Sequence, residues 1–494
     1  MTLSKHLQDP SLLKSRYLCD GQWRSALSEA VFTVDDPATG ATIASVPNAD
    51  AEDARAAIDA AHRAWPAWRA LTGKERARRL RAWYDLLCQH AGDLAAIIAG
   101  EEGKPLAEAR GEVDYGLSFV EWFAEEAKRV NGDVLQSPAA DKRLVVIKQP
   151  IGVCVSITPW NFPLAMITRK VAPALAAGCP VVIKPAELTP LTALAAGELA
   201  IRAGIPAGVL NILTADSANS IAIGKVLCAS DVVRHISFTG STEVGRILMA
   251  QSAPTVKKMS LELGGNAPFI VFDDADVDSA VEGAFASKYR NAGQTCVCSN
   301  RFYVQEGVYD EFVAKFAAKV KTAKVGNGFE DGVNQGPLIE EAALEKVQRH
   351  LDDALAKGGQ VVAGGQRLKT LGSGQFFEPT VVANATPDML CAREETFGPF
   401  APVFKFKTEQ EAIDAANNTE FGLASYFYSR DVGRIFRVGE ALEYGMVGIN
   451  VGILATEHVP FGGVKQSGLG REGSHYGMDD YVEIKYLCLG DIQK

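Results

Sequence analysis

The spacing of apolar residues changes along the chain, and it predicts helices in one part and alternating strands and helices in the next. Over residues 50–130, apolar residues recur every three or four positions, which is typical of amphipathic helices. From about residue 153, short apolar runs take over, namely GVCVSITPW, PVVIKPA, GVLNILT and HISFTGS. Helical segments follow the last three runs, and apolar strands that alternate with helices indicate a parallel sheet covered on both faces. Because ligands of such sheets bind beyond the carboxyl ends of the strands, TPWN, KP and FTGS are candidate binding segments.

A second alternating region starts near MSLELGGNAPFIVF, at residue 259, and runs past residue 450. It includes the helical segment DVDSAVEGAFASKYRNAG, a helix around GVYDEFVAKFAAKV and the strand-like APVFKFK, so it predicts a second α/β domain. Between the first helices and the first apolar run, KRLVVIK, Gln149-Pro150-Ile151-Gly152 and VCVSIT predict a hairpin, since Pro and Gly punctuate its turn. The tail DDYVEIKYLCLGD predicts a strand.

The length and charge of the chain limit the classes of protein to which it can belong. At 494 residues it is too long for one ordinary core, so two or three domains are expected. Its formal net charge of −10 argues against a nucleic-acid surface, which needs a basic stripe, but a local arginine pair would still bind an anionic substrate. No stretch of about eighteen apolar residues lacks charges or breakers, and the N-terminus has no apolar signal region. We therefore expect a cytoplasmic protein with neither a membrane nor a nucleic-acid partner.

Nine cysteines are spread through the chain, and only Cys296 and Cys298, in NAGQTCVCSN, stand one residue apart. An odd number at irregular spacings argues against a disulfide framework. Structural zinc takes four ligands, typically from CxxC pairs or spaced histidines; this chain has no CxxC and its histidines are scattered, so no metal is expected. Most of the cysteines are expected to be small buried hydrophobes. A reactive thiolate at Cys296 would need an environment that stabilises the anion, or a nearby base.

Two glycine-containing motifs carry further candidate chemistry, and for each a structural alternative stays open. Glu262 lies in LELGGN, between a strand and a Gly-Gly turn, and is either a general base or an exposed loop glutamate. FTGSTEVG, residues 238–245, places Gly240 at the start of a helix, where free amides suit a phosphate. Its spacing matches neither the dinucleotide motif G-x-G-x-x-G nor a P-loop, so a structural turn is an equal alternative.

Six motifs become specific together, because they occur in one order across some 240 residues. They are TPWNFP (158–163), KPAE (184–187), FTGS, LELGGN, GQTC and EETFGPF (394–400). The set closely resembles the NAD(P)-dependent aldehyde dehydrogenase superfamily, and the similarity extends over nearly the whole chain, including PFGGVKQSGLGREG (460–473). Within the superfamily, NFPLAMITRK, CVCSNR and GGVKQSGLGREGSHYG look most similar to succinate-semialdehyde dehydrogenases.

The resemblance implies the α/β aldehyde dehydrogenase fold, with two parallel-sheet α/β domains and a small β oligomerisation element. The NAD-binding domain would comprise residues 1–136 and 154–261, and the catalytic domain residues 262–465. The oligomerisation hairpin and tail would comprise residues 137–153 and 466–494. A homo-oligomer, either a dimer or a tetramer, is expected on the same grounds.

The resemblance also implies roles in an oxidation that passes through a thiohemiacetal and a thioester. Cys296 matches the nucleophile, Glu262 the base that activates the deacylating water, and Asn161 the oxyanion donor, assisted by the backbone amide of Cys296. The cofactor is expected to be NAD, with some use of NADP. The positions that match cofactor-binding residues are Ile157, Thr158, Trp160, Lys184, Glu187, Gly240, Ser241, Glu395 and Phe397.

The expected substrate carries a distal anion. In succinate-semialdehyde dehydrogenases, arginines at the positions of Arg169 and Arg290 clamp the distal carboxylate, a task that suits the forked guanidinium; the alternative for each is a salt bridge. Those enzymes usually place a serine where this chain has Ala455, and Thr456 and His458 lie nearby, His458 as a replacement donor. Succinate semialdehyde is the expected substrate. Glutarate semialdehyde, 2-oxoglutarate semialdehyde and sulfolactaldehyde would keep the arginine clamp and stand as alternatives.

Further alternatives concern the second cysteine and the class of protein. Cys298 is either a small packed residue, which we favour, or the partner of Cys296 in a strained, reversible disulfide, as in some similar enzymes. A non-catalytic binding protein on this fold is disfavoured because Cys296, Glu262 and Asn161 are all present. An enzyme that passes the acyl group to coenzyme A is disfavoured because such enzymes typically lack the base at Glu262, so hydrolysis to the acid is expected.

Overall fold

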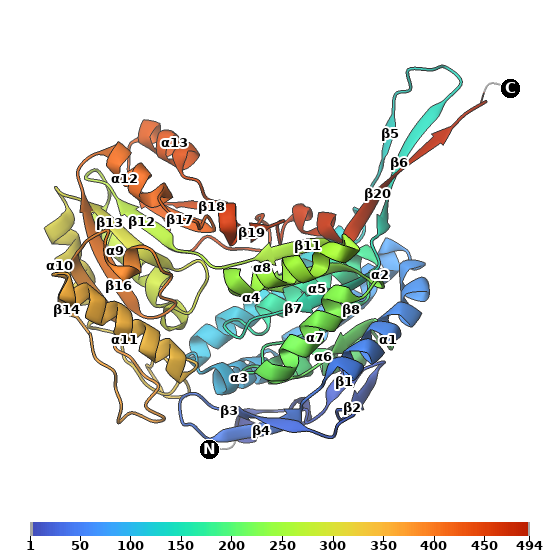
Figure 1. The fold of residues 1–494 in the computed structure, drawn as a ribbon, viewed down its shortest axis with the longest axis horizontal. Helices are drawn as coiled ribbons and strands as arrows, with labels where there is room; N and C mark the ends of the chain where they lie inside the picture. Colours follow the sequence, from blue (N-terminus) through green and yellow to red (C-terminus); the bar gives the residue numbers. More distant parts are fainter. Residues whose placement is uncertain (1–2, 493–494) are drawn as a thin grey trace.

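Two large β-sheets, each covered by helices, form two lobes, and a narrow β-arm projects from one of them (Figure 1). The computed structural model describes residues 3–492. Both sheets are mainly parallel, with helices between successive strands, so the predicted α/β class with two parallel-sheet domains is confirmed. Short 3-10 helices join several elements: η1 Leu3–His6, η2 Pro10–Leu12, η3 Ala253–Thr255, η4 Arg290–Gly293, η5 Leu390–Ala392, η6 Lys465–Ser467 and η7 His475–Tyr481.

The first sheet has eight strands in the order β19-β11-β10-β7-β8-β9-β1-β2. Its strands are β1 Tyr17–Cys19, β2 Gln22–Arg24, β7 Val153–Ile157, β8 Val181–Lys184, β9 Leu210–Ile212, β10 Val233–Thr239, β11 Lys258–Glu262 and β19 Gly468–Leu469. The five strands from β11 to β9 are parallel, and four of them are the four apolar runs of the sequence. The runs are mainly apolar because helices cover both faces of the sheet.

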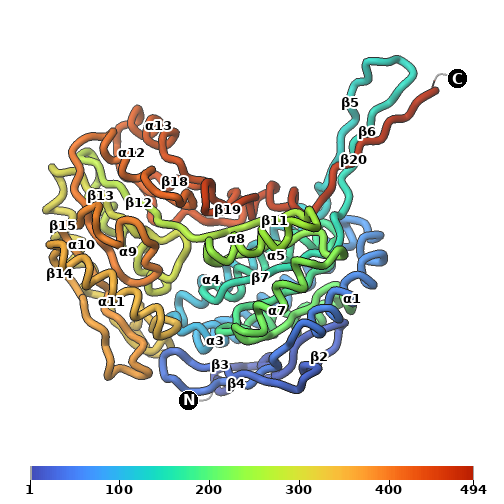
Figure 2. Tube along the Cα trace, in the orientation of Figure 1, coloured from blue at the N-terminus to red at the C-terminus, as the bar shows by residue number. Residues whose placement is uncertain are grey.

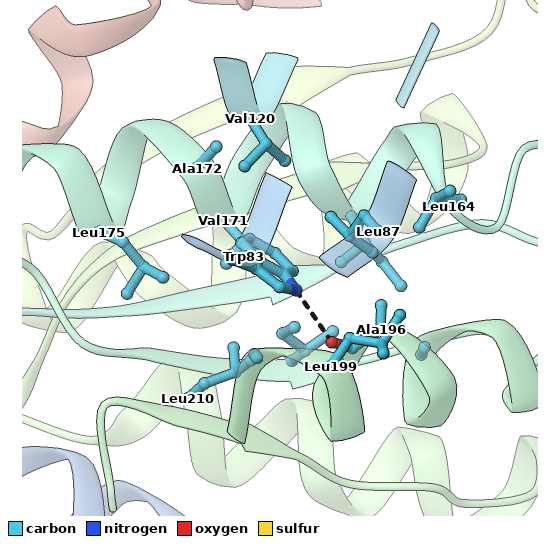
Figure 3. Close-up of a cluster of buried hydrophobic side chains, with 14 of the residues drawn as sticks. Trp83, Leu87, Val120, Leu164, Val171, Ala172, Leu175, Ala196, Leu199 and Leu210 are labelled. Carbon is cyan, nitrogen blue, oxygen red and sulfur yellow. Dashed lines mark hydrogen bonds between the residues drawn. The ribbon is translucent and has the colours of Figure 1, made fainter. Parts of the chain in front are cut away.

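The helices of the first lobe pack on this sheet in two main clusters of buried side chains, one of which contains Trp83. They are α1 Ala51–Arg69, α2 Gly73–Gln89, α3 Ala91–Glu102, α4 Leu106–Glu126, α5 Ala165–Ala177, α6 Leu191–Arg202, α7 Ser217–Ala229 and α8 Thr242–Ser252. Figure 3 shows Trp83 of α2 between Val171 of α5 and Leu199 of α6, where its indole N–H donates to the carbonyl of Ala196 at 3.1 Å. A buried indole needs such a partner, and this bond ties α2 to α6.

The second sheet has seven strands in the order β14-β15-β16-β13-β12-β17-β18. Its strands are β12 Ala267–Val271, β13 Ser299–Gln305, β14 Gln360–Ala363, β15 Thr380–Ala385, β16 Phe400–Phe406, β17 Ala424–Tyr428 and β18 Met446–Ile449. Its helices are α9 Val277–Tyr289, α10 Tyr309–Val320, α11 Glu341–Ala356, α12 Glu409–Asn417 and α13 Val432–Ala441. Only the edge strand β14 is antiparallel to its neighbour among the described strands of this sheet.

The strand that was expected to open the second region, β11, belongs to the first sheet instead. It pairs in parallel with β10, so that Thr239 lies opposite Glu262 at the carboxyl end of both strands. The chain crosses to the second lobe only after this point, through residues 263–266. Glu262 therefore ends a strand of the first lobe and faces the boundary between the lobes.

The hairpin predicted across Gln149-Pro150-Ile151-Gly152 is wrong, because its two strands lie in different sheets. β6 (Arg143–Pro150) pairs with β5 (Asp133–Leu135) and with β20 (Val482–Leu489), and these three strands form the projecting arm. β7 instead lies between β8 and β10 in the first sheet. Gly152, with a φ of 139°, lets the chain turn from one sheet into the other, so the turn residues mark a sheet boundary.

The C-terminal segment connects the second lobe to the arm. In Figure 2 it returns, in red, from the second lobe past β11 to the arm, where β20 pairs antiparallel with all of β6. β19 is added to the edge of the first sheet on the way. A separate two-stranded sheet consists of β3 (Val31–Asp35) and β4 (Thr42–Pro47). Within residues 3–492, no helix combines the length and the apolar character that crossing a bilayer requires.

Candidate active site

The segment that leads to Cys296 is held in an unusual backbone conformation. α9 ends at Tyr289, and Asn291, Ala292 and Gly293 then follow with φ values of 52°, 54° and 77°. Left-handed conformations are unfavourable for residues other than glycine, and they persist only where surrounding contacts impose them. The half-buried Cys296 follows this turn directly, so its position depends on those contacts.

Asn161 meets this segment from the other lobe. It lies in the loop between β7 and α5, is only 4% exposed, and donates from Nδ2 to the carbonyl of Gln294 at 2.9 Å. An asparagine amide carries two N–H donors, and within residues 3–492 the second has no partner. The structure thus brings Asn161 beside the loop of Cys296 with one donor left over.

Glu262 is buried at the end of β11, so the alternative of an exposed loop glutamate is wrong. Its Oε2 has no hydrogen-bond partner among the described residues. Burial raises the pKa of Glu262 well above its usual value, and the nearby Glu472 carboxylate raises it further, against the charges of Arg169 and Lys170. A carboxylate with a raised pKa is a stronger base, which suits a group that takes a proton from water.

The thiol of Cys296 lies in the same electrostatic environment. Burial raises the pKa of Cys296 to about 12, and the carboxylates of Glu395 and Glu262 oppose the anion as well. The guanidinium groups of Arg169 and Arg290 lower the same pKa. The thiol is therefore the resting form, and it has to lose its proton before the sulfur attacks.

Cys298 is a free, buried thiol. Its Sγ contacts the carbonyl of Gly293 at 3.2 Å and the ammonium of Lys288 at 3.8 Å. Each of the nine cysteines of the chain is free in the structure. The packed interpretation and the redox interpretation of Cys298 both remain predictions.

The two candidate clamp arginines differ in their partners. Arg169, on α5, is buried, forms an ion pair from Nε to Oε2 of Glu472, and lies over the ring of Phe461 at 4.2 Å. Arg290, at the end of α9, is half-buried and lies over the ring of Phe162 at 5.3 Å. Within residues 3–492 it has no ion pair or side-chain hydrogen bond. Arg290 thus keeps all of its N–H donors for a ligand, whereas Arg169 already has a carboxylate partner.

A cavity of about 220 Å³ lies in front of Arg290. Its lining residues are Lys104, Glu108, Gly111, Glu112, Tyr115, Phe162, Arg290 and Ala455. A smaller hollow beside it shares Arg290 and Ala455 and includes Ser287 and Tyr426. Sequence reasoning assigned no role to Phe162, although it lies in the motif TPWNFP, and it missed Lys104 and Tyr115 because nothing in their local sequence sets them apart from packing residues.

Thr456 and His458 do not line this cavity in the described part of the chain. Both are exposed, and the His458 ring packs edge-on against Trp122 with ring centroids 4.7 Å apart. Its Nδ1 lies 2.8 Å from the carboxylate of Glu457. The expectation that His458 replaces the missing serine therefore disagrees with the structure, because the loop after β18 turns that side chain to the surface.

The strand order of the first sheet has a topological switch point, and the space beyond its carboxyl edge is called the crevice below. From β7 the chain continues through β8 and β9 on one side, and it then crosses back to place β10 and β11 on the other side of β7. Ligands of open α/β sheets bind at such a switch point. Ile157, Thr158 and Trp160 end β7 or follow it, while Gly240 and Ser241 follow β10 and begin α8. Five of the candidate cofactor residues therefore flank the crevice.

Lys184 and Glu187 lie beside the crevice at the end of β8. The Lys184 side chain is 7% exposed, and its Nζ lies 3.4 Å from Oε2 of Glu187. Burial lowers the pKa of this ammonium. Burial raises the pKa of Glu340, the residue that precedes α11, and the nearby Glu187 carboxylate raises it further. The site thus offers ammonium donors and a carboxylate acceptor, as ribose hydroxyls require.

Glu395 and Phe397 approach the crevice from the second lobe. The ring of Phe397 meets Trp160 edge-on, with centroids 5.7 Å apart. Oε1 of Glu395 accepts the backbone N–H of Gly265 at 3.0 Å, and burial raises the pKa of Glu395 to about 7. A crevice with buried donors at one end and aromatic and carboxyl groups at the other fits a dinucleotide that extends from the first lobe toward Cys296.

Comparison with known proteins agrees with this geometry. The model of the Aldehyde dehydrogenase family matches residues 23–487. The 3-sulfolactaldehyde dehydrogenase of Pseudomonas putida is 60% identical over 488 residues, which cover 99% of both chains. The succinate-semialdehyde dehydrogenase GabD of Escherichia coli strain K12, named for NADP(+), is 58% identical over 484 residues, covering 98% of this chain and 99% of that protein. The crystal structure of succinate-semialdehyde dehydrogenase from Burkholderia pseudomallei is 62% identical, with a TM-score of 0.96 over 98% of this chain and 99% of that one. The chain belongs to the aldehyde dehydrogenase family, and it is an aldehyde dehydrogenase.

Proposed function

We propose that this enzyme oxidises a short aldehyde with a distal anionic group to the corresponding acid, and that succinate semialdehyde is its best substrate. The observation that supports this proposal is Arg290, a half-buried guanidinium without an ion-pair partner among residues 3–492, at the wall of a cavity of about 220 Å³. The Phe162 ring and Ala455 line the same cavity, so apolar groups lie beside the guanidinium. A carboxylate on the substrate pairs bidentately with such a guanidinium.

The candidate catalytic residues divide the reaction into addition and hydrolysis. The Cys296 thiolate adds to the carbonyl carbon, and the oxygen becomes an anion that the free N–H of Asn161 stabilises. Bound NAD would be held by Lys184 and Glu187 and supplies a hydride acceptor. Loss of hydride from the tetrahedral carbon leaves a thioester on Cys296, and Glu262 then takes a proton from the water that hydrolyses it.

The cofactor preference is proposed to be NAD over NADP. Glu187 accepts a hydrogen bond from a ribose hydroxyl in this arrangement, and the 2′-phosphate of NADP would meet that carboxylate instead. Like-charge repulsion and loss of hydration then oppose NADP. Glu340 adds a second carboxyl near Glu187, and Lys184 offsets part of the repulsion, so some use of NADP is expected.

Oxidation of a sulfonated aldehyde is the second candidate, and Ala455 is the observation that favours it. The small side chain of Ala455 leaves a hollow beside Arg290, lined also by Ser287. A sulfonate is bulkier than a carboxylate and has three acceptor oxygens, so the extra space suits it. The Pseudomonas putida relative named as a 3-sulfolactaldehyde dehydrogenase is 60% identical to this chain.

A kinetic panel tests the proposal. Succinate semialdehyde, glutarate semialdehyde, 3-sulfolactaldehyde and neutral butyraldehyde are compared by kcat/KM with NAD and with NADP. Succinate semialdehyde is expected to exceed butyraldehyde about a hundredfold, because each 1.4 kcal/mol corresponds to roughly a factor of ten. Cys296→Ala should bind NAD, keep its melting temperature and lose all turnover. Near-equal values for charged and neutral aldehydes would refute the anion site, and turnover by Cys296→Ala would refute the nucleophile.

The assembly is proposed to be a homo-oligomer, a dimer or tetramer, that uses the β-arm. Apolar side chains on the arm face solvent in the isolated chain, since Val134 is 78% exposed, Ile484 71% and Tyr486 55%. A narrow three-stranded arm with exposed apolar groups is stabilised by packing on a second copy. Light scattering after size exclusion should give at least a dimer, and Ile484→Glu should shift the population toward monomer. A cytoplasmic location stays a prediction from the sequence.

A further inference from the structure

The backbone carbonyl of Asn161 is held from two sides, although only its side chain has been assigned a role. Nζ of Lys104 donates to this oxygen at 2.7 Å, and Nδ2 of Asn291 donates to it at 2.9 Å. Both donors belong to residues that are only 2% exposed. A carbonyl oxygen has two lone pairs, so its hydrogen-bonding capacity is filled. Movement of the Asn161 backbone therefore breaks two buried hydrogen bonds.

Lys104 belongs to a buried ion pair with Glu112. It lies in the turn between α3 and α4, its side chain is 1% exposed, and its Nζ lies 2.6 Å from Oε2 of Glu112. The Phe162 ring lies beneath the ammonium, with 3.9 Å from Nζ to its centroid. Replacing a buried ion pair with apolar residues of similar volume often leaves stability unchanged or raises it. Stability alone therefore does not account for this pair, and its contacts with the loop are the informative feature.

The same ion pair fixes the loop at a second point. Oε1 of Glu112 accepts the backbone N–H of Leu164 at 2.9 Å, where α5 begins. Leu164 has no side-chain cap of its own, so the Glu112 carboxylate serves the orphan N–H groups of this helix end. Lys104 therefore holds the loop at the carbonyl of Asn161, and Glu112 holds it at the N–H of Leu164.

One turn earlier on α4, Glu108 holds the segment of the nucleophile. Its Oε2 accepts the backbone N–H of Asn291 at 2.7 Å, and Asn291 is the first of the left-handed residues that lead to Cys296. Residues four apart lie on the same face of a helix, so Glu108 and Glu112 face the two loops together. The side chain of Asn291 then joins those loops at the Asn161 carbonyl.

We propose that Lys104 is a positioning residue of the reaction, which holds the backbone of Asn161 so that its free side-chain N–H points at the oxygen of the thiohemiacetal. This inference rests on the proposed roles of Asn161 and Cys296. Lys104 lines the substrate cavity, but its ammonium is already committed to Glu112 and to the Asn161 carbonyl. Direct binding of the substrate anion is therefore the alternative that the experiment has to separate.

The central variant is Lys104→Met, which keeps the length of the side chain and removes the ammonium. Displacement of a reacting group by about 1 Å lowers rates roughly a hundredfold, so the burst of NADH is expected to slow by about that factor. The slowing should be the same for succinate semialdehyde and for butyraldehyde. The Kd for NAD and the rate at which iodoacetamide alkylates Cys296 should stay at wild-type values. Neither result follows from general damage to the fold.

A double-mutant cycle with Asn161→Ala decides whether Lys104 acts through Asn161. If it does, the Lys104→Met/Asn161→Ala variant transfers hydride no more slowly than Asn161→Ala alone. Arg76→Met is the matched control, because Arg76 is 8% exposed and donates to the carbonyls of Leu71 and Ala176. It removes a buried cation from the same lobe and is expected to lower the melting temperature without slowing the burst.

The possible contrary results overturn different claims. Multiplicative effects in the cycle would overturn the inference, as would a raised KM for succinate semialdehyde alone, which would assign Lys104 to the anion. A slow Asn161→Ala with a wild-type burst in Lys104→Met would overturn the inference and leave the proposed function intact. A wild-type burst in Asn161→Ala would overturn both. If Lys104→Met does not fold, Lys104→Met/Glu102→Gln/Glu112→Gln takes its place in every comparison, because it also neutralises the two buried carboxylates that lie 3.9 Å and 2.6 Å from Nζ of Lys104.

Discussion

Replacing Arg290 with glutamine removes the one cation without an ion pair that lines the cavity of about 220 Å³, within residues 3–492. A charge-assisted hydrogen bond contributes roughly 1.5–3 kcal/mol, and about 1.4 kcal/mol corresponds to tenfold, so kcat/KM for succinate semialdehyde should fall about ten- to a hundredfold. The half-buried position of Arg290 places the expected value in the lower part of that range, since water screens part of the interaction. Most of the loss should appear in KM, because the anion is bound equally in the ground and transition states.

A second effect of the same change has to be separated from the first. The Arg290 guanidinium also lowers the pKa of Cys296, so its removal disfavours the thiolate and slows every aldehyde. Butyraldehyde measures that effect alone, because it has no anion for Arg290 to bind. The informative quantity is therefore the ratio of kcat/KM for succinate semialdehyde to that for butyraldehyde, determined for the wild type, Arg290→Gln and Arg290→Lys. Lysine keeps the charge and loses the fork, so its ratio should lie between the other two.

The reasoning fails if the ratio is the same in the wild type and in Arg290→Gln. Arg169→Gln provides the contrast, since Arg169 is paired with Glu472 inside the chain. Removing it leaves Glu472 as a buried carboxylate with only Lys170 as an ion-pair partner, so the main expected effect is a lower melting temperature. If Arg169→Gln lost the preference for the anion and Arg290→Gln kept it, the anion site would have to be assigned to α5.

Four further results are expected. Glu262→Gln should give a burst of NADH followed by slow turnover, because an amide takes no proton from water, and an unchanged steady-state rate would exclude Glu262 as the base. Glu187→Gln should raise kcat/KM for NADP relative to NAD by removing the carboxylate that faces the 2′-phosphate, and a wild-type ratio would contradict that contact. Cys298→Ala should be inactivated by peroxide at the wild-type rate, as a packed residue predicts, whereas resistance that depends on reversible oxidation would show that Cys298 pairs with Cys296. Burial raises the pKa of Glu102 to about 8, above its unfolded value near 4.5, so between these values the folded chain binds a proton that the unfolded chain has lost, and its stability falls as pH rises from about 5 to 8. Glu102→Gln should therefore reduce the fall in melting temperature over this pH range, and an unchanged dependence on pH would contradict the shift.

The local sequence determined the parallel strands β7, β8, β9 and β10 of the first sheet and the identity of the family. Runs such as VCVSI are apolar at all but one position because helices cover both faces of the sheet, and such a run is visible in the local sequence. Ordered motifs such as TPWNFP and GQTC identify candidate residues because each motif combines an unusual backbone requirement with a chemical group. Gly293, with a φ of 77°, belongs to the turn that precedes Cys296 and shows why glycine stands there.

Pairing between distant segments was decided only by the tertiary structure. The residues around Pro150 and Gly152 indicate a turn, but they do not indicate the sheet to which each flanking strand belongs. β6 pairs with β20, which lies more than three hundred residues further along the chain. Hydrophobic periodicity is a short-range signal, whereas strand partners are selected by the whole set of edges that the fold presents. The same limit explains why β11 was expected in the second lobe.

The ion pairs of the site also depend on the tertiary structure. Arg169 and Glu472 are 303 positions apart in the sequence, and only the return of the C-terminal segment past the first sheet brings them into contact. Lys104 meets Glu112 and Asn161 because α4 packs beside the loop that precedes α5. The spacing of charged residues along the sequence does not identify their ion-pair partners. A buried charge is stabilised by whichever opposite charge or dipole the fold places within hydrogen-bond distance. The sequence therefore determined which chemical groups this enzyme has, and the tertiary structure determined which of them remain free to meet a substrate.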